Sequence, residues 1–185
     1  VPYAKCNVTD QLDNIQNVNW LSCTRADSPN ALRDTSHWVK YDFGHVVELF
    51  QSQVWNYNET GNTSNGFEVV AVDYSIDGTN WTELGIYNWN LATGADDYSG
   101  FVGPDFGGAM AQYVLITSLD DPNLQSCRGF GKVAFTTIMC PNLGQACDDG
   151  DNTTINDSID INCVCVGESF YLNDCILDNL TLGDT

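Results

Sequence analysis

Hydrophobic and polar residues alternate along much of residues 17–137, and this two-residue period is typical of β-strands. No window shows the 3.6-residue apolar period of a helix, and Gly, Asn and Asp interrupt the alternation at short intervals. The predicted strands are Trp38–Phe43, Val46–Trp55, Phe67–Ser75, Trp81–Ile86, Ala111–Ser118 and Phe130–Thr137. The pattern predicts an all-β chain built as an antiparallel β-sandwich or barrel.

The pattern changes at Cys140. From there to Gly167 the residues are small, polar and rich in cysteine, so this segment cannot bury a hydrophobic core and needs disulfides or a metal. We therefore expect three parts: the sandwich at 1–139, a Cys/Asp-rich disulfide module at 140–167, and an acidic tail or the start of a following unit at 168–185.

The charge of the chain excludes two classes of partner. Among 185 residues there are 25 Asp and Glu but 6 Lys and Arg, which gives a formal net charge of −19. Nucleic acids and anionic membranes are bound by clustered cations, whereas these six are scattered singly. No apolar run approaches the ~20 residues of a membrane span. We expect no nucleic-acid partner and no direct membrane insertion, and we expect salt or calcium to screen the charge.

The cysteines indicate an oxidising compartment. An even number in an acidic chain is typical of disulfides, and zinc is disfavoured because there is no Cys-x-x-Cys pair. Several Asn-x-Ser/Thr sequons agree with a secreted or cell-surface glycoprotein. The eight cysteines are Cys6, Cys23, Cys127, Cys140, Cys147, Cys163, Cys165 and Cys175.

Several segments resemble discoidin-like domains, the coagulation factor 5/8 type C family. Trp20–Cys23 and Ser36–Gly44 resemble the opening strands of that family, and Val72–Thr82 resembles one of its hairpins. Ala111–Thr117 and Cys127–Phe135 are similar to its last two core strands. The resemblance implies an eight-stranded, galactose-binding-like jelly roll whose loops at one end bind a ligand, often a galactose-type sugar.

The Cys/Asp-rich module has a resemblance of its own. Cys147–Asp157 and Asn162–Gly167 are similar to a short unit of secreted and surface proteins of Bacteroidetes-type bacteria, which links adhesin domains there.

The disulfide pairing is predicted only in part. Cys23 and Cys127 both lie in the sandwich, so we expect them to pair. The four cysteines from Cys140 to Cys165 are expected to close the module among themselves, with three connectivities open. Cys6 and Cys175 are left, to pair with each other or with a neighbouring copy.

One acidic loop has the spacing of a calcium site. Steps 1, 3, 5, 7, 9 and 12 of an EF-hand loop fall on Asp149, Asp151, Thr153, Ile155, Asp157 and Asp160. Thr154 replaces the usual glycine, and no helices flank the loop. A solvated acidic turn is the alternative interpretation.

The discoidin-like resemblance bears on a second calcium site. Sugar-binding relatives hold a structural calcium with an Asp near the first loop and a Glu on the last strand. Asp34 matches the first position, but Lys132 occupies the second. The resemblance therefore implies that this calcium is absent or altered and that Lys132 pairs with Asp34.

The candidate glycan site lies in the loops. Sugars are bound by an aromatic face beneath their C–H surface and by polar side chains that contact their hydroxyls. Trp89 is the preferred aromatic, and each arginine has the alternative of pairing with a carboxylate. The predicted ligand-binding residues are Asn30, Arg33, Asn56, Tyr57, Trp89, Tyr98 and Arg128.

These observations favour an extracellular, non-catalytic module that binds carbohydrate or mediates adhesion, with a glycan or glycoprotein as its partner. His37 and His45 fit no catalytic motif. Two alternatives stay open. One is a structural subunit of an extracellular filament or surface layer that contacts copies of itself, and the other is an accessory domain of a secreted hydrolase.

Overall fold

The computed structural model describes residues 19–120, 127–138, 142–160 and 163–169. The chain divides into two compact units, Val1–Met139 and Cys140–Thr185, which are described separately. No helix in the described ranges is long and apolar enough to cross a membrane.

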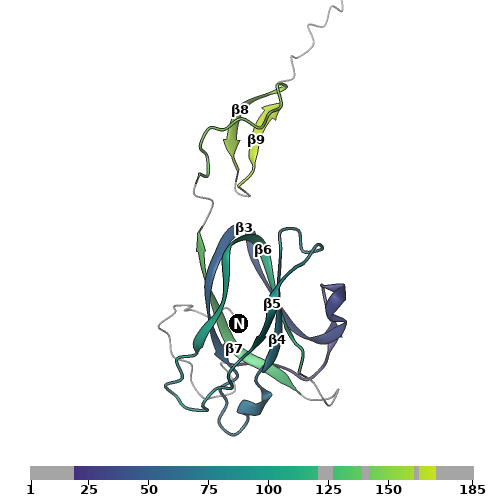
Figure 1. The fold of residues 1–185 in the computed structure, drawn as a ribbon, viewed down its shortest axis with the longest axis vertical. Coiled ribbons are helices and arrows are strands. Elements are labelled where there is room, and N and C mark those ends of the chain that lie inside the picture. Colours follow the sequence, from purple (N-terminus) through teal and green to yellow (C-terminus); the bar gives the residue numbers. More distant parts are fainter. Residues whose placement is uncertain (1–18, 121–126, 139–141, 161–162, 170–185) are drawn as a thin grey trace, which may run out of the picture. The chain divides into compact units, whose positions relative to one another are not determined.

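The first unit is an antiparallel β-sandwich (Figure 1). Its strands follow the hydrogen-bonded order β1-β7-β3-β6-β4-β5, and β2 pairs with β3. This confirms the predicted all-β jelly-roll sandwich. The strands are β1 (Trp20–Ser22), β2 (Ala26–Asp27), β3 (Thr35–Asn56), β4 (Val69–Ser75), β5 (Thr82–Asn88), β6 (Phe101–Ser118) and β7 (Arg128–Ile138).

Strands β3 and β6 are long and bend. The first part of β3 pairs with the end of β6, as in Trp38↔Thr117, and its last part pairs with the start of β6, as in Val54↔Phe101. The register shifts between Asp42 and Val47, where Gly44 has a φ of 78°. A bulge with a left-handed glycine bends a strand without ending it. The break predicted at Gly44 is therefore a bend inside one strand.

The sandwich has one open side. In the described part of the chain, β5 pairs only with β4, and residues 101–110 of β6 pair only with β3. Pro104 is tolerated here because an edge strand does not need every N–H. At Gly103 a Cβ atom would lie 2.5 Å from Ser52 Oγ, so glycine lets β6 approach β3 closely. Residues 101–110 therefore form a strand, although the alternation predicted one only from Ala111.

An aromatic cluster lies in the core. The Phe67 ring packs edge-on against Phe130 with centroids 5.3 Å apart, and Trp89 stacks on Phe67 at 6.4 Å. All three side chains are buried, and they join the residues that flank β4 and β5 to strand β7. This cluster fixes the position of the chain immediately after β5.

A disulfide joins the first strand of the sandwich to its last. Cys23 and Cys127 are bonded, with Cα atoms 4.0 Å apart and a sequence separation of 104. Strand pairing brings them together, since Ser22 lies opposite Arg128 in the β1–β7 register.

The second unit is a small hairpin held by disulfides. Strands β8 (Thr154–Ile159) and β9 (Cys165–Ser169) are antiparallel, and Cys147 is bonded to Cys165. Cys163 is also disulfide-bonded. The apolar side chains Ile155, Val164 and Val166 are exposed, as expected for a module without a hydrophobic core. Cys6, Cys140 and Cys175 lie outside the described residues, as does the tail from residue 170.

Candidate functional site

Two of the predicted ligand residues hold loops together. The Asn56 side chain is fully buried, and its Nδ2 donates to the carbonyl oxygens of Phe67 and Asn90 at 2.8 and 2.9 Å. Tyr57 is also fully buried, and its hydroxyl donates to Glu59. Burial, and then Glu59, raises the pKa of Tyr57 above its usual range. Neither side chain reaches solvent, so the expected ligand role is corrected to a structural one.

The first predicted loop also uses its polar groups internally. Asn30 is buried and caps the 3₁₀ helix η2 (Ala31–Arg33), accepting from Leu32 N at 3.1 Å. Arg33 donates through Nε and Nη2 to the two carboxylate oxygens of Asp73, at 2.9 and 2.6 Å, and through Nη2 to Glu83. These bonds, that to Asp73 first, raise the pKa of Arg33 further above its usual value. Arg33 therefore takes the carboxylate-pairing alternative.

Arg128 and Tyr98 are buried as well. The Arg128 guanidinium donates to the Asp120 carbonyl oxygen at 2.9 and 2.7 Å. The Tyr98 hydroxyl accepts from Asn56 N at 3.3 Å, and burial raises the pKa of Tyr98. Both residues stabilise loops from inside, which corrects their expected role as ligand contacts.

The predicted Asp34–Lys132 pair does not form. Lys132 is 5% exposed, and its ammonium lies over the Trp55 ring at 4.3 Å from the centroid, a cation–π contact. Asp34 is exposed after η2.

Trp89 lies close to a candidate site, but in a different role from the one expected. Its side chain is 5% exposed and its ring stacks on Phe67, so its face is not a platform for a sugar. Its indole N–H is buried and has no hydrogen-bond acceptor in the described part of the chain. Trp89 does line a pocket, and the aromatic residues of that pocket that are only half-buried are Tyr87 and Phe101.

The pocket lies on the open side of the sandwich, where the end of β5 meets the start of β6. We call it the edge pocket; its volume is about 350 Å³, within the range of small-ligand sites. It is lined by Tyr87, Asn88, Trp89, Asn90, Phe101, Val102, Gly103, Pro104 and Asp105.

Aromatic side chains form one part of the edge pocket. Tyr87 is half-buried, and the end of its ring packs over Gly85, where a Cβ would lie 3.1 Å from the Tyr87 hydroxyl oxygen. Burial raises the pKa of Tyr87. Phe101 meets Trp89 edge-on, with centroids 6.0 Å apart. The alternation predicted a strand that ends at Ile86, whereas β5 continues through Tyr87, which lies next to the exposed Ile86.

The polar groups of the edge pocket are available to a ligand. Asn88 and Asn90 are exposed, and their side-chain amides make no hydrogen bond within the described residues. Asp105 Oδ1 accepts from Gly107 N at 2.9 Å, which leaves Oδ2 without a partner in the described part. Aromatic rings beside free amide and carboxylate groups are the chemistry that binds sugars.

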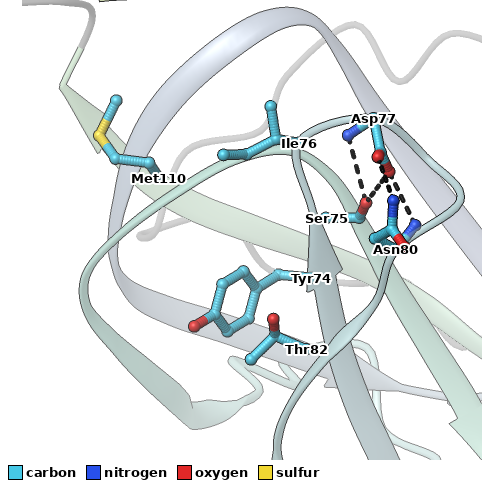
Figure 2. Close-up of a pocket in the computed structure, with 7 residues that line it drawn as sticks. All are labelled: Tyr74, Ser75, Ile76, Asp77, Asn80, Thr82 and Met110. Atoms are coloured by element: carbon cyan, nitrogen blue, oxygen red, sulfur yellow. Dashed lines mark hydrogen bonds between the residues drawn. The ribbon is translucent and has the colours of Figure 1, made fainter.

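A second pocket, of about 280 Å³, lies at the β4–β5 hairpin (Figure 2). Its carboxylate belongs to the turn, since Asp77 accepts from Asn80 N at 2.7 Å, Asn80 Nδ2 at 2.6 Å and Thr79 N at 2.8 Å. These hydrogen bonds, that from Asn80 N first, hold the pKa of Asp77 well below its usual value. Tyr74 and Thr82 lie apart from this cluster, and Ile76 and Met110 supply apolar lining of the pocket. The edge pocket thus offers more free polar groups.

The second unit contains an acidic cluster. Oxygens of Asp148, Asp149 and Asp157 lie within 4.8 Å of one another. Asp157 Oδ2 accepts from Asp149 N at 3.2 Å, whereas Asp157 Oδ1 is buried and has no hydrogen-bond partner in the described residues.

The predicted EF-hand ligand set does not assemble. Residues Thr154–Ile159 form strand β8, which rises about 3.3 Å per residue and so carries Asp160 away from the start of the loop. Asp160 Oδ1 instead accepts from Val164 N at 3.0 Å, and Asp151 Oδ1 accepts from Thr153 N at 2.9 Å. Ile155, at step 7, would ligate through its backbone carbonyl, and it lies in strand β8 rather than in a loop. Of the predicted ligands, Asp149 and Asp157 do lie close together. The third carboxylate of the cluster belongs to Asp148, which the EF-hand spacing had not included.

No protein-family model and no curated protein matches the chain. Among solved structures, it is similar to the CBM32-3 domain of a family 31 glycoside hydrolase from Clostridium perfringens, with 17% identity, a TM-score of 0.48, and coverage of 65% of this chain and 75% of that one. A Streptococcus pneumoniae fucose-binding module has 16% identity, a TM-score of 0.45, and coverage of 68% and 76%. The chain also matches 19% of the length of a glycoside hydrolase, with a TM-score of 0.38. These are partial likenesses of fold, and what those proteins bind is a property of those proteins.

Proposed function

We propose that this chain is an extracellular carbohydrate-binding module and that the edge pocket is its binding site. The observation that supports the proposal is the set of side chains in that pocket. A half-buried aromatic ring on a rigid strand lies beside two unbonded amides and a carboxylate oxygen. The pocket holds no pair of groups arranged for acid–base catalysis, and binding without turnover is the function that this chemistry supports.

Replacing Tyr87 with Ala is expected to weaken binding to the preferred glycan about 30-fold. Covering about 80 Å² of ring at ~25 cal/mol per Å² contributes about 2 kcal/mol, and every ~1.4 kcal/mol is a tenfold change in affinity. A glycan array would identify the ligand, and isothermal titration calorimetry would then compare the variant with the unaltered protein.

Ile86→Ala is the matched control, because Ile86 is the exposed neighbour of Tyr87 on β5 and does not line the edge pocket. Its affinity should stay within twofold of the unaltered protein. Equal binding by Tyr87→Ala, or no binding of any glycan by the unaltered chain, would refute the assignment of this site.

We also propose that the acidic cluster of the second unit binds calcium. Calcium prefers carboxylate oxygens, and the buried, unpartnered Asp157 Oδ1 is an oxygen that a cation would satisfy. Asp148 and Asp149 would supply the other carboxylates. Bound calcium would offset the repulsion among these three charges and stiffen the hairpin.

Asp157→Asn is expected to weaken calcium binding at least tenfold, measured by calorimetry with calcium and, separately, with magnesium. Asp151→Asn removes the same charge from the same loop but outside the cluster, so it should keep most of the affinity. If Asp151→Asn weakens binding as much as Asp157→Asn, or if the unaltered protein binds no calcium at millimolar concentration, the cluster is a solvated acidic turn.

A further inference from the structure

The edge pocket carries charge of one sign only. None of the nine residues that line it is Lys, Arg or His, and Asp105 is their single carboxylate. Asp105 is exposed, and because its Oδ1 is held by Gly107 N, the carboxylate is kept in place at the start of β6.

Four of the chain's six Lys and Arg residues are engaged away from this pocket. Arg33 pairs with Asp73 and Glu83, and Arg128 binds the Asp120 carbonyl. Lys40 lies over the Tyr113 ring at 5.0 Å, and Lys132 lies over Trp55. With a formal net charge of −19, the field around the molecule repels anions as well.

We propose that the edge pocket selects uncharged glycans and excludes those with uronic acid or sulfate groups, and that Asp105 sets this selectivity. The proposal rests on the carbohydrate-binding function above. Asp105 Oδ2 accepts hydrogen bonds from neutral hydroxyls, whereas a ligand carboxylate or sulfate placed there offers no proton and is repelled. A like charge at ~4–6 Å in a partly solvated pocket weakens binding about tenfold.

The test uses pairs of polysaccharides that share a backbone and differ in charge: fully methyl-esterified and de-esterified homogalacturonan, and an uncharged galactan and its sulfated form. Affinity electrophoresis at about 10 mM and 300 mM NaCl measures both members of each pair. We expect the neutral member to bind at least tenfold more tightly at low salt, with the difference shrinking at high salt because salt screens the repulsion.

Asp105→Asn should shrink the neutral-to-anionic affinity ratio at least fivefold, and the asparagine oxygen retains the acceptor for Gly107 N. Asp96→Asn is the control, since it changes the net charge equally but does not line the pocket, and it should leave the ratio within twofold. Anionic members that bind as tightly as neutral ones, or a ratio that Asp105→Asn leaves unchanged, would overturn the selectivity while the binding function stands. Failure of every polysaccharide to bind would overturn the binding function and the selectivity with it.

Discussion

A variant in which Cys23 and Cys127 are both replaced by Ala is expected to lose about 4 kcal/mol of unfolding free energy. The disulfide closes a loop of 104 residues, and loop-closure entropy in the unfolded chain predicts a stabilisation of about 4–5 kcal/mol for that length. The corresponding fall in Tm is roughly 10–25 °C. Tryptophan fluorescence reports this transition selectively, because all five tryptophans lie between residues 20 and 89.

The matched control removes the Cys147–Cys165 bond, which closes a loop of 18 residues in the other unit. That variant should leave the tryptophan-detected transition within about 0.5 kcal/mol, because the bond it removes closes no loop of the sandwich. If the two double variants destabilised the sandwich equally, the Cys23–Cys127 bond would not act by restricting the unfolded sandwich.

Asp73→Ala is expected to lower the unfolding free energy of the sandwich by about 3 kcal/mol. Asp73 is 0% exposed and accepts both bonds of a two-point ion pair, so its removal leaves the Arg33 side chain, itself 9% exposed, without its buried partner. Breaking one half of a buried pair typically costs about 3–5 kcal/mol, and Glu83 retains part of the contact. Urea unfolding followed by tryptophan fluorescence measures the loss.

Two further variants separate this effect from a general loss of surface charge. Glu83 is 50% exposed, so Glu83→Ala should cost no more than about 1 kcal/mol. The double variant Arg33→Met/Asp73→Leu should recover most of the stability, because apolar residues often replace a buried ion pair without loss. A double variant as unstable as Asp73→Ala alone would show that the site needs the charges themselves.

The strand pattern predicted the sandwich but not its open side. Alternation over residues 67–75 and 111–118 corresponds closely to β4 and the second half of β6. The first half of β6 contains Gly103 and Pro104, which are turn residues in most contexts. Gly103 can lie in a strand beside Ser52 because it has no Cβ, which would lie too close to the Ser52 side chain. Pro104 can lie in a strand because residues 101–110 have no second neighbouring strand that would need its N–H. Neither condition is visible in local sequence.

The sequence predicted which types of side chain would bind a glycan, but not where on the sandwich they come together. Polar loop residues such as Asn56 and Arg128 suggested ligand contacts, yet their side chains satisfy the carbonyl groups of neighbouring loops. A polar residue in a loop has the same identity whether it binds a partner or another loop. Tyr87 and Asp105 line one pocket because β5 and residues 101–110 of β6 each pair on one side only, which is a property of the topology.

The pairing of β1 with β7 also determines when the sandwich can close during synthesis. Trp20 pairs with Phe130, so the first strand has no partner until the ribosome has added more than one hundred further residues. Over the same interval Cys23 lacks its final partner Cys127, and its thiol can exchange with other thiols. The register that places Ser22 opposite Arg128 then selects Cys127 as its partner. The correct disulfide is therefore a late product of strand pairing, and slow oxidation should favour it over mispairing with the cysteines that follow.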